Sequence, residues 1–115
     1  MPIKPTITFD DFEKVDIRVG KIIEVIDFER SKFPSYKLTI DFGEELGLKK
    51  SSARFKSNYR PEQLLDKQCL AVVNFEPRNI AGFMSEVLVL GIDAVGGGIS
   101  IVRPFDEAIL GAKLY

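Results

Sequence analysis

The sequence contains no histidine and no tryptophan, and it has one cysteine among 115 residues. Histidine is the commonest general base and metal ligand in proteins, so its absence removes the usual starting point for acid–base or metal catalysis. Cys69 cannot form an internal disulfide, and it lies in the apolar run 69–73, which predicts a buried and inert thiol. A lone cysteine of this kind is typical of a protein in a reducing cytoplasm.

Long apolar stretches are also missing. None approaches the ~20 residues that a membrane-spanning helix needs, and the first six residues lack the apolar core of a signal peptide. The formal net charge of −1 argues against strong non-specific attraction to nucleic acid unless the basic residues are segregated. An apolar content of 45% and a charged content of 29% indicate a globular chain. We expect one cytoplasmic domain without membrane insertion.

The motifs of the common enzyme classes are absent. There is no Gly-x-x-x-x-Gly-Lys and no Ser-x-x-Lys, and Cys69 has no histidine to activate it. The glycines at 96–98 precede a predicted strand, so they lack the helix N-terminus that binds phosphate. The carboxylate pairs Asp10-Asp11 and Glu44-Glu45 are better explained by a helix N-terminus and a solvated turn. We therefore expect no catalytic residue, no metal site, no cofactor and no enzymatic activity.

What the sequence does contain is a set of short alternating and apolar segments, typical of strands. The first loses its alternation at Gly20-Lys21, which predicts a bulge or bend there. Thr8 is placed to cap a short helical turn, and Pro61 to begin a second. The expected helices are 8–13 and 61–65, and the expected strands are 15–26, 36–42, 48–55, 68–75, 86–92 and 99–102.

About five main strands, with one helix between the third and the fourth, predict an all-β protein. This pattern matches the five-stranded OB-fold barrel with short helices, which binds oligonucleotides or other ligands across one face and its loops. A small β-sandwich is the alternative, because the pattern does not define how the sheet closes.

The segment 48–61 carries five cations and no acidic residue. Cations can follow phosphates while aromatic rings stack on unpaired bases, and Phe55 and Tyr59 are interleaved here. The alternative is a strand edge protected by lysines, with both rings in the core. The candidate RNA-binding residues of this segment are Lys49, Lys50, Ser51, Ser52, Arg54, Lys56 and Arg60.

The segment 74–90 reads as a strand, a proline–glycine loop and a second strand. Its apolar side chains exceed what a simple hairpin loop needs, so they close the barrel, line a dimer contact or form an exposed pocket. The candidate peptide-binding residues are Phe75, Ile80, Phe83 and Met84. The segment also holds polar RNA-binding candidates, which are Asn74, Arg78, Asn79 and Ser85.

Several motifs resemble a known family. The run 16–22, Asp-Ile-Arg-Val-Gly-Lys-Ile, is similar to the opening motif of the tRNA-binding domain appended to some methionyl-tRNA synthetases. Asn74, Pro77-Arg78, Gly82 and Ser85 match that domain's Asn-x-x-Pro-Arg…Gly…Ser signature. The runs 49–53 and 83–91 more closely resemble the CsaA secretion chaperones. The resemblance covers residues 8–115, which we expect to form the OB-fold domain after an N-terminal extension, residues 1–7.

The resemblance implies a cytoplasmic OB-fold homodimer related to tRNA-binding domains. It also implies a chaperone that binds preproteins or unfolded peptide segments without ATP, in protein secretion. Val87-Leu88 and 79–81 depart from the glycine, methionine and basic residues of many tRNA-binding relatives, which shifts the loop toward apolar ligands. The alternative is an RNA-binding module that acts in trans on tRNA or other structured RNA. If the loop and the basic segment share one face, tRNA and peptide should compete.

Overall fold

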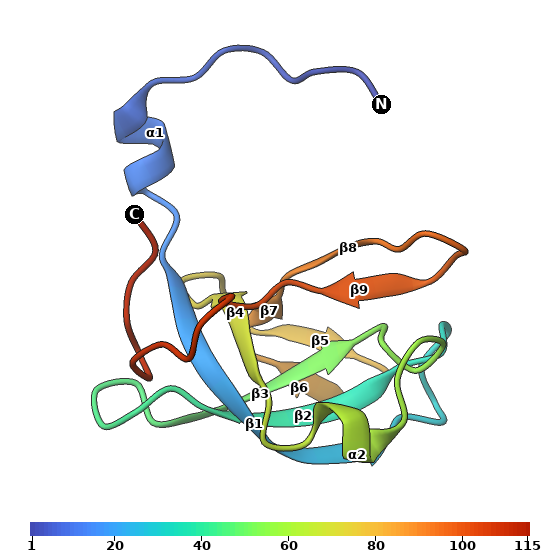
Figure 1. The fold of residues 1–115 in the computed structure, drawn as a ribbon. Coiled ribbons are helices and arrows are strands. Elements are labelled where there is room, and N and C mark those ends of the chain that lie inside the picture. The colour runs from blue at the N-terminus through green and yellow to red at the C-terminus, as the bar shows by residue number, and fades with distance from the viewer.

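The computed structural model describes all residues 1–115, and its centre is one curled antiparallel sheet with the strand order β3-β2-β1-β4-β7 (Figure 1). Its strands are β1 (Ile17–Asp27), β2 (Tyr36–Asp41), β3 (Leu48–Ala53), β4 (Gln68–Val72) and β7 (Leu88–Val89). The outer strands meet where the N–H groups of Glu86 and Val87 donate to the Lys50 carbonyl, at 2.8 and 3.4 Å. With helix α2 (Pro61–Leu64) between β3 and β4, this is the predicted OB-fold barrel.

The long strand β1 joins the two halves of the barrel. Its first half pairs with β4 and its second half with β2. The prediction of a bulge at Gly20-Lys21 is wrong, because the register of β1 against β2 shifts between Ile22 and Glu24. Gly20 has a different role. A Cβ there would lie 2.8 Å from Phe42 Cε1 and closer still to Ile40 Cγ2, so only glycine fits against these two core side chains.

The core fills the barrel from every strand of the sheet. In β2 the inward residues Tyr36, Leu38 and Ile40 are buried, as the alternating pattern predicts. Phe55 is buried, and Tyr59 packs edge-to-face against it with ring centroids 6.0 Å apart. Phe55 is therefore a core side chain that cannot stack on a base, whereas Tyr59 is only partly buried against the core.

Cys69 is completely buried in this core, as the sequence predicts. Burial disfavours the thiolate and raises the pKa of the thiol to about 12. At pH 8 the native protein is therefore expected to react with an aromatic disulfide at least ~100-fold more slowly than the denatured chain. The absorbance of the released aromatic thiolate, followed over time with and without guanidinium, measures this ratio of reaction rates. Equal rates in the two conditions would contradict the buried placement.

Two small hairpins are attached to the barrel. The first consists of β5 (Arg78–Ile80) and β6 (Phe83–Ser85), and the second of β8 (Gly91–Asp93) and β9 (Ile99–Ile101). The single strand predicted over 86–92 is wrong, because Leu90 divides it. The Leu90 N–H donates to the Leu70 carbonyl at 2.9 Å, while its own carbonyl accepts from the Val102 N–H at 3.1 Å. The backbone thus passes from the barrel to the second hairpin at this residue.

The C-terminal end of the chain lies beside the start of β1, whereas the N-terminal end lies well away from it (Figure 1). Helix α1 (Phe9–Glu13) is capped by Thr8, as predicted, whose Oγ1 accepts from the Asp11 N–H at 3.1 Å. The C-terminal tail pairs with β1 through Val19, which donates to the Ala112 carbonyl at 3.1 Å and accepts from the Gly111 N–H at 2.8 Å. None of the helices combines the length and the apolar character needed to cross a membrane.

Candidate functional site

Two adjoining pockets form a groove on one side of the barrel. The first pocket has a volume of about 420 Å³ and lies among β3, the loop 31–35 and strands β7 and β8. The second has a volume of about 510 Å³ and lies between β3 and the segment 75–88. The two pockets share four lining residues, which are Ser52, Arg78, Ile80 and Leu88. We refer to both together as the groove.

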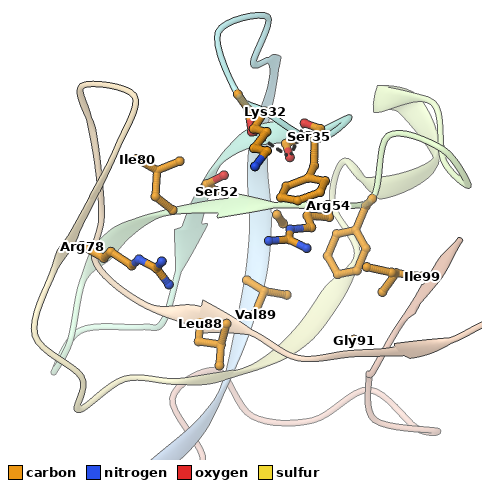
Figure 2. Close-up of a pocket in the computed structure, with 14 residues that line it drawn as sticks. Lys32, Ser35, Ser52, Arg54, Arg78, Ile80, Leu88, Val89, Gly91 and Ile99 are labelled. Atoms are coloured by element: carbon orange, nitrogen blue, oxygen red, sulfur yellow. Dashed lines mark hydrogen bonds between the residues drawn. The ribbon is translucent and has the colours of Figure 1, made fainter.

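Three cations from separate segments surround the first pocket. Figure 2 shows the charged ends of Lys32, Arg54 and Arg78 directed toward the same space. The Arg54 guanidinium carbon lies 3.8 Å from the centroid of the Phe33 ring, so the guanidinium stacks on that ring. None of the three cations takes part in an ion pair. They are therefore free to meet an anionic group of a ligand.

Most other cations of the basic segment lie elsewhere. Lys56 pairs with Asp27 at 2.6 Å, and the hydrogen bond that its ammonium group donates to this carboxylate raises the pKa of Lys56. Arg60 pairs with Glu62 at 2.7 Å. Lys49 and Lys50 lie at the opposite end of β3 from Arg54 and line neither pocket. Of the RNA-binding candidates in this segment, the structure thus brings only Ser52 and Arg54 into the groove.

Two of the candidate serines join the segment after the first hairpin to β3. Ser51 is fully buried, and its hydroxyl donates to the Val87 carbonyl at 2.9 Å. The Ser85 hydroxyl accepts from the Ser52 N–H at 3.0 Å. Both side chains hold the wall of the groove against the barrel, and Ser85 also lines the second pocket.

The candidate amides also have partners within the chain. The Asn74 side chain accepts from the Asp16 N–H at 3.0 Å and donates to the Lys14 carbonyl at 2.8 Å. It thereby ties the end of β4 to the residues that lead into β1. The Asn79 side chain accepts from the Gly82 N–H at 2.8 Å, which closes the turn between β5 and β6. Both amides shape the segment that leads to the second pocket.

The apolar candidates separate into two groups. Phe75 lines the second pocket and is 56% exposed, while Ile80 lines both pockets. Phe83 packs edge-to-face on Phe28, with ring centroids 5.5 Å apart, and so anchors the hairpin. Met84 follows Phe83 in β6, so it points to the opposite face of the hairpin, where it is 48% exposed. Neither Phe83 nor Met84 lines the groove.

Several groove residues are not among the sequence candidates, including Leu88, Lys32, Phe33 and the two carboxylates Glu76 and Glu86. Leu88 lies at the junction of the two pockets and is 48% exposed, which is unusual for an apolar strand residue. Lys32 and Phe33 come from the loop between the strands predicted at 15–26 and 36–42, for which the sequence predicts only a connection. The only sequence signal for this loop is an aromatic residue beside a cation, and that pair is common on protein surfaces.

Comparison with known proteins places these features in context. The family described as "Putative tRNA binding domain" matches residues 17–113. The crystal structure of the CsaA chaperone protein from Picrophilus torridus has 48% sequence identity and a TM-score of 0.90, and the match covers 96% of this chain and 100% of that chain. For the chaperone CsaA from Bacillus anthracis strain Ames the identity is 41% and the TM-score 0.89, with the same coverage.

Longer proteins match as well. The methionine–tRNA ligase of Pyrococcus abyssi is 38% identical over 108 residues, which are 94% of this chain and 14% of the ligase. The chain therefore spans only about one seventh of the length of the curated relatives that it matches.

Proposed function

Because the chain belongs to the tRNA-binding domain family, and over its whole length is similar to two CsaA chaperones, we propose that it is an ATP-independent chaperone. It binds preproteins or unfolded peptide segments in the groove, in the cytoplasm, and has no enzymatic activity of its own. The observation that carries this proposal is the groove itself, in which exposed apolar side chains lie beside unpaired cations.

The energetics of the groove suit weak and reversible binding. Complete covering of the exposed parts of Phe75 and Leu88 is worth about 4–5 kcal/mol, at roughly 25 cal/mol per Å² of apolar surface. Hydrogen bonds to the peptide backbone and the three cations add to this. The sum offsets the cost of ordering a flexible peptide by a small margin, so release needs no nucleotide.

The test of this proposal is fluorescence anisotropy with a labelled, unfolded preprotein segment. The double variant Ile80→Ala with Leu88→Ala is expected to bind about tenfold more weakly, because it removes apolar surface at the junction of the pockets. Met84→Ala is the matched control, since Met84 is equally exposed on the other face of the same hairpin, and its affinity should not change. Wild-type affinity in a folded double variant would place the peptide site elsewhere.

A tRNA- or RNA-binding module acting in trans is the second candidate function. It is supported by the family match and by the unpaired groove cations Lys32, Arg54 and Arg78. Three phosphate contacts correspond to a log–log salt slope of about −2 to −3. In filter binding to tRNA, the double variant Arg54→Gln with Arg78→Gln should reduce the magnitude of that slope by about 2. A slope near zero in the wild type would argue against this function. Both functions use these arginines, so tRNA should compete with peptide.

Homodimerisation is part of the proposal. Large apolar side chains are exposed on α1, on the second hairpin and on the C-terminal tail. These side chains are Phe9, Ile92, Val95, Phe105 and Ile109. A chain of this size gains from covering such surface. We propose that the domain, residues 8–115, forms the dimer and that the arm, residues 1–7, extends from it. Sedimentation at several concentrations tests this, and a monomer mass throughout would refute it.

A further inference from the structure

The charged side chains along the groove are segregated by sign. The residues that line the first pocket include Lys32, Arg54 and Arg78 and no carboxylate (Figure 2). The second pocket also contains Arg78, at the junction, but its other charged groups are Glu76 and Glu86. One end of the groove is thus purely cationic, and the other end carries two carboxylates.

At the cationic end, Arg54 is presented in a fixed orientation. One face of its guanidinium is covered by the Phe33 ring at 3.8 Å, which leaves the edges of the guanidinium for hydrogen bonds. A guanidinium stacked in this way donates in parallel to both oxygens of a carboxylate. Lys32 lies on the same ring at 5.9 Å and adds a second positive charge.

At the other end, the carboxylates are available to a cationic group. One oxygen of Glu86 accepts from the Lys50 N–H at 3.0 Å, which holds the side chain at the wall of the second pocket. Glu76 is exposed and has no ion pair. Between the two ends, Ile80 and Leu88 form the apolar junction.

From this arrangement we propose that the groove selects peptide segments with one acidic and one basic side chain separated by apolar residues. The acidic side chain meets Arg54 in the first pocket and the basic side chain meets Glu76 and Glu86 in the second. An extended chain advances about 3.3 Å per residue, so a spacer of about three to five residues covers roughly 10–17 Å. The inference rests on the proposed chaperone function. It disfavours a polyanion such as RNA along the whole groove, because two carboxylates would face phosphates.

The experiment uses four labelled peptides with blocked ends and the same apolar centre, each made in both orders. Their end residues are Glu and Lys, Gln and Lys, Glu and Gln, or Gln and Gln. The Glu/Lys peptide should bind most tightly in fluorescence anisotropy at low salt, and each neutral replacement should weaken binding about three- to tenfold. Higher salt should reduce these differences.

Variants assign each preference to its pocket. Arg54→Gln should abolish the preference for Glu over Gln and leave the preference for Lys, whereas Glu76→Gln should do the reverse. Arg103→Gln and Glu107→Gln are the matched controls, because both residues are exposed and lie outside the groove, and neither should change the ranking.

The outcomes separate this inference from the function on which it rests. Equal binding of all four peptides would refute the charge selection and leave the chaperone proposal intact. Binding of none of them, with a preprotein segment also failing, would refute both. If a single-stranded oligoribonucleotide binds instead, and Arg54→Gln weakens it while Glu76→Gln strengthens it, the groove is a phosphate site and the inference is overturned.

Discussion

Replacement of Gly20 by alanine is expected to destabilise the protein by about 2–3 kcal/mol, the upper range for overpacking a tight core. The added methyl group would lie within contact distance of Phe42 and even closer to Ile40, and both side chains are buried. Gly20 pairs with Cys69 of β4, and the neighbouring Val19 is hydrogen-bonded to the C-terminal tail, so the backbone cannot move away easily. Urea unfolding followed by circular dichroism should show a lower midpoint with an unchanged slope.

A second variant identifies the cause of this loss. Ile40→Ala removes the side chain that meets the new methyl group, so Gly20→Ala should cost less in its presence than in the wild type. The double-mutant cycle should give a favourable coupling of about 1 kcal/mol. An unchanged midpoint for Gly20→Ala alone would show that the contact is relieved by a small shift of β1.

Deletion of residues 110–115 is expected to cost about 2–4 kcal/mol. It removes the partners of three backbone groups of β1, namely the Val19 N–H, the Val19 carbonyl and the Ile17 carbonyl. Each such hydrogen bond contributes roughly 0.5–1.5 kcal/mol. The Arg18 guanidinium also loses its bond to the Gly111 carbonyl, which is 3.1 Å long. The free energy of unfolding in urea measures the total effect.

The matched control is deletion of a similar length at the other end. Residues 1–6 are exposed and lie outside every helix and strand, so their removal should change the free energy of unfolding by less than about 0.5 kcal/mol. If the two deletions had equal effects, the tail would not be part of the folded sheet.

The barrel was predictable where local patterns carry the information. Thr8 caps its helix through a bond to a residue three positions away, and the inward residues Tyr36, Leu38 and Ile40 of β2 follow the alternation of the sequence, although Thr39 is buried as well. The division of 86–92 was not predictable, because a continuous apolar run has no period that marks a change of partner. Gly20 was misread, since a glycine in a strand indicates either a bulge or a close approach. The position of the C-terminal tail is not predictable from local patterns, because the tail pairs through backbone hydrogen bonds with a strand that is distant in the sequence.

The groove was partly predictable from the sequence. Ser52, Arg54, Phe75, Arg78 and Ile80 were candidates, and the structure places all of them in it. The contribution of the loop 31–35 depends on how the barrel folds, so a single sequence gives little sign of it.

Phe83 and Met84 were also candidates, but the structure places them outside the groove for a local reason. The hairpin of β5 and β6 was read as an open loop, and side-chain alternation in a strand sends adjacent residues to opposite faces. Phe83 therefore turns to the barrel wall and Met84 to the outer surface.

The pairing of the C-terminal tail with the start of β1 also determines how this domain can be attached to other domains. The C-terminal end of the chain leaves the molecule beside Ile17, whereas the loop that lines the first pocket follows the far end of β1 at Asp27. Eleven strand residues separate these points, roughly 30 Å along the strand. A linker attached at the C-terminus would therefore leave the groove open to a ligand.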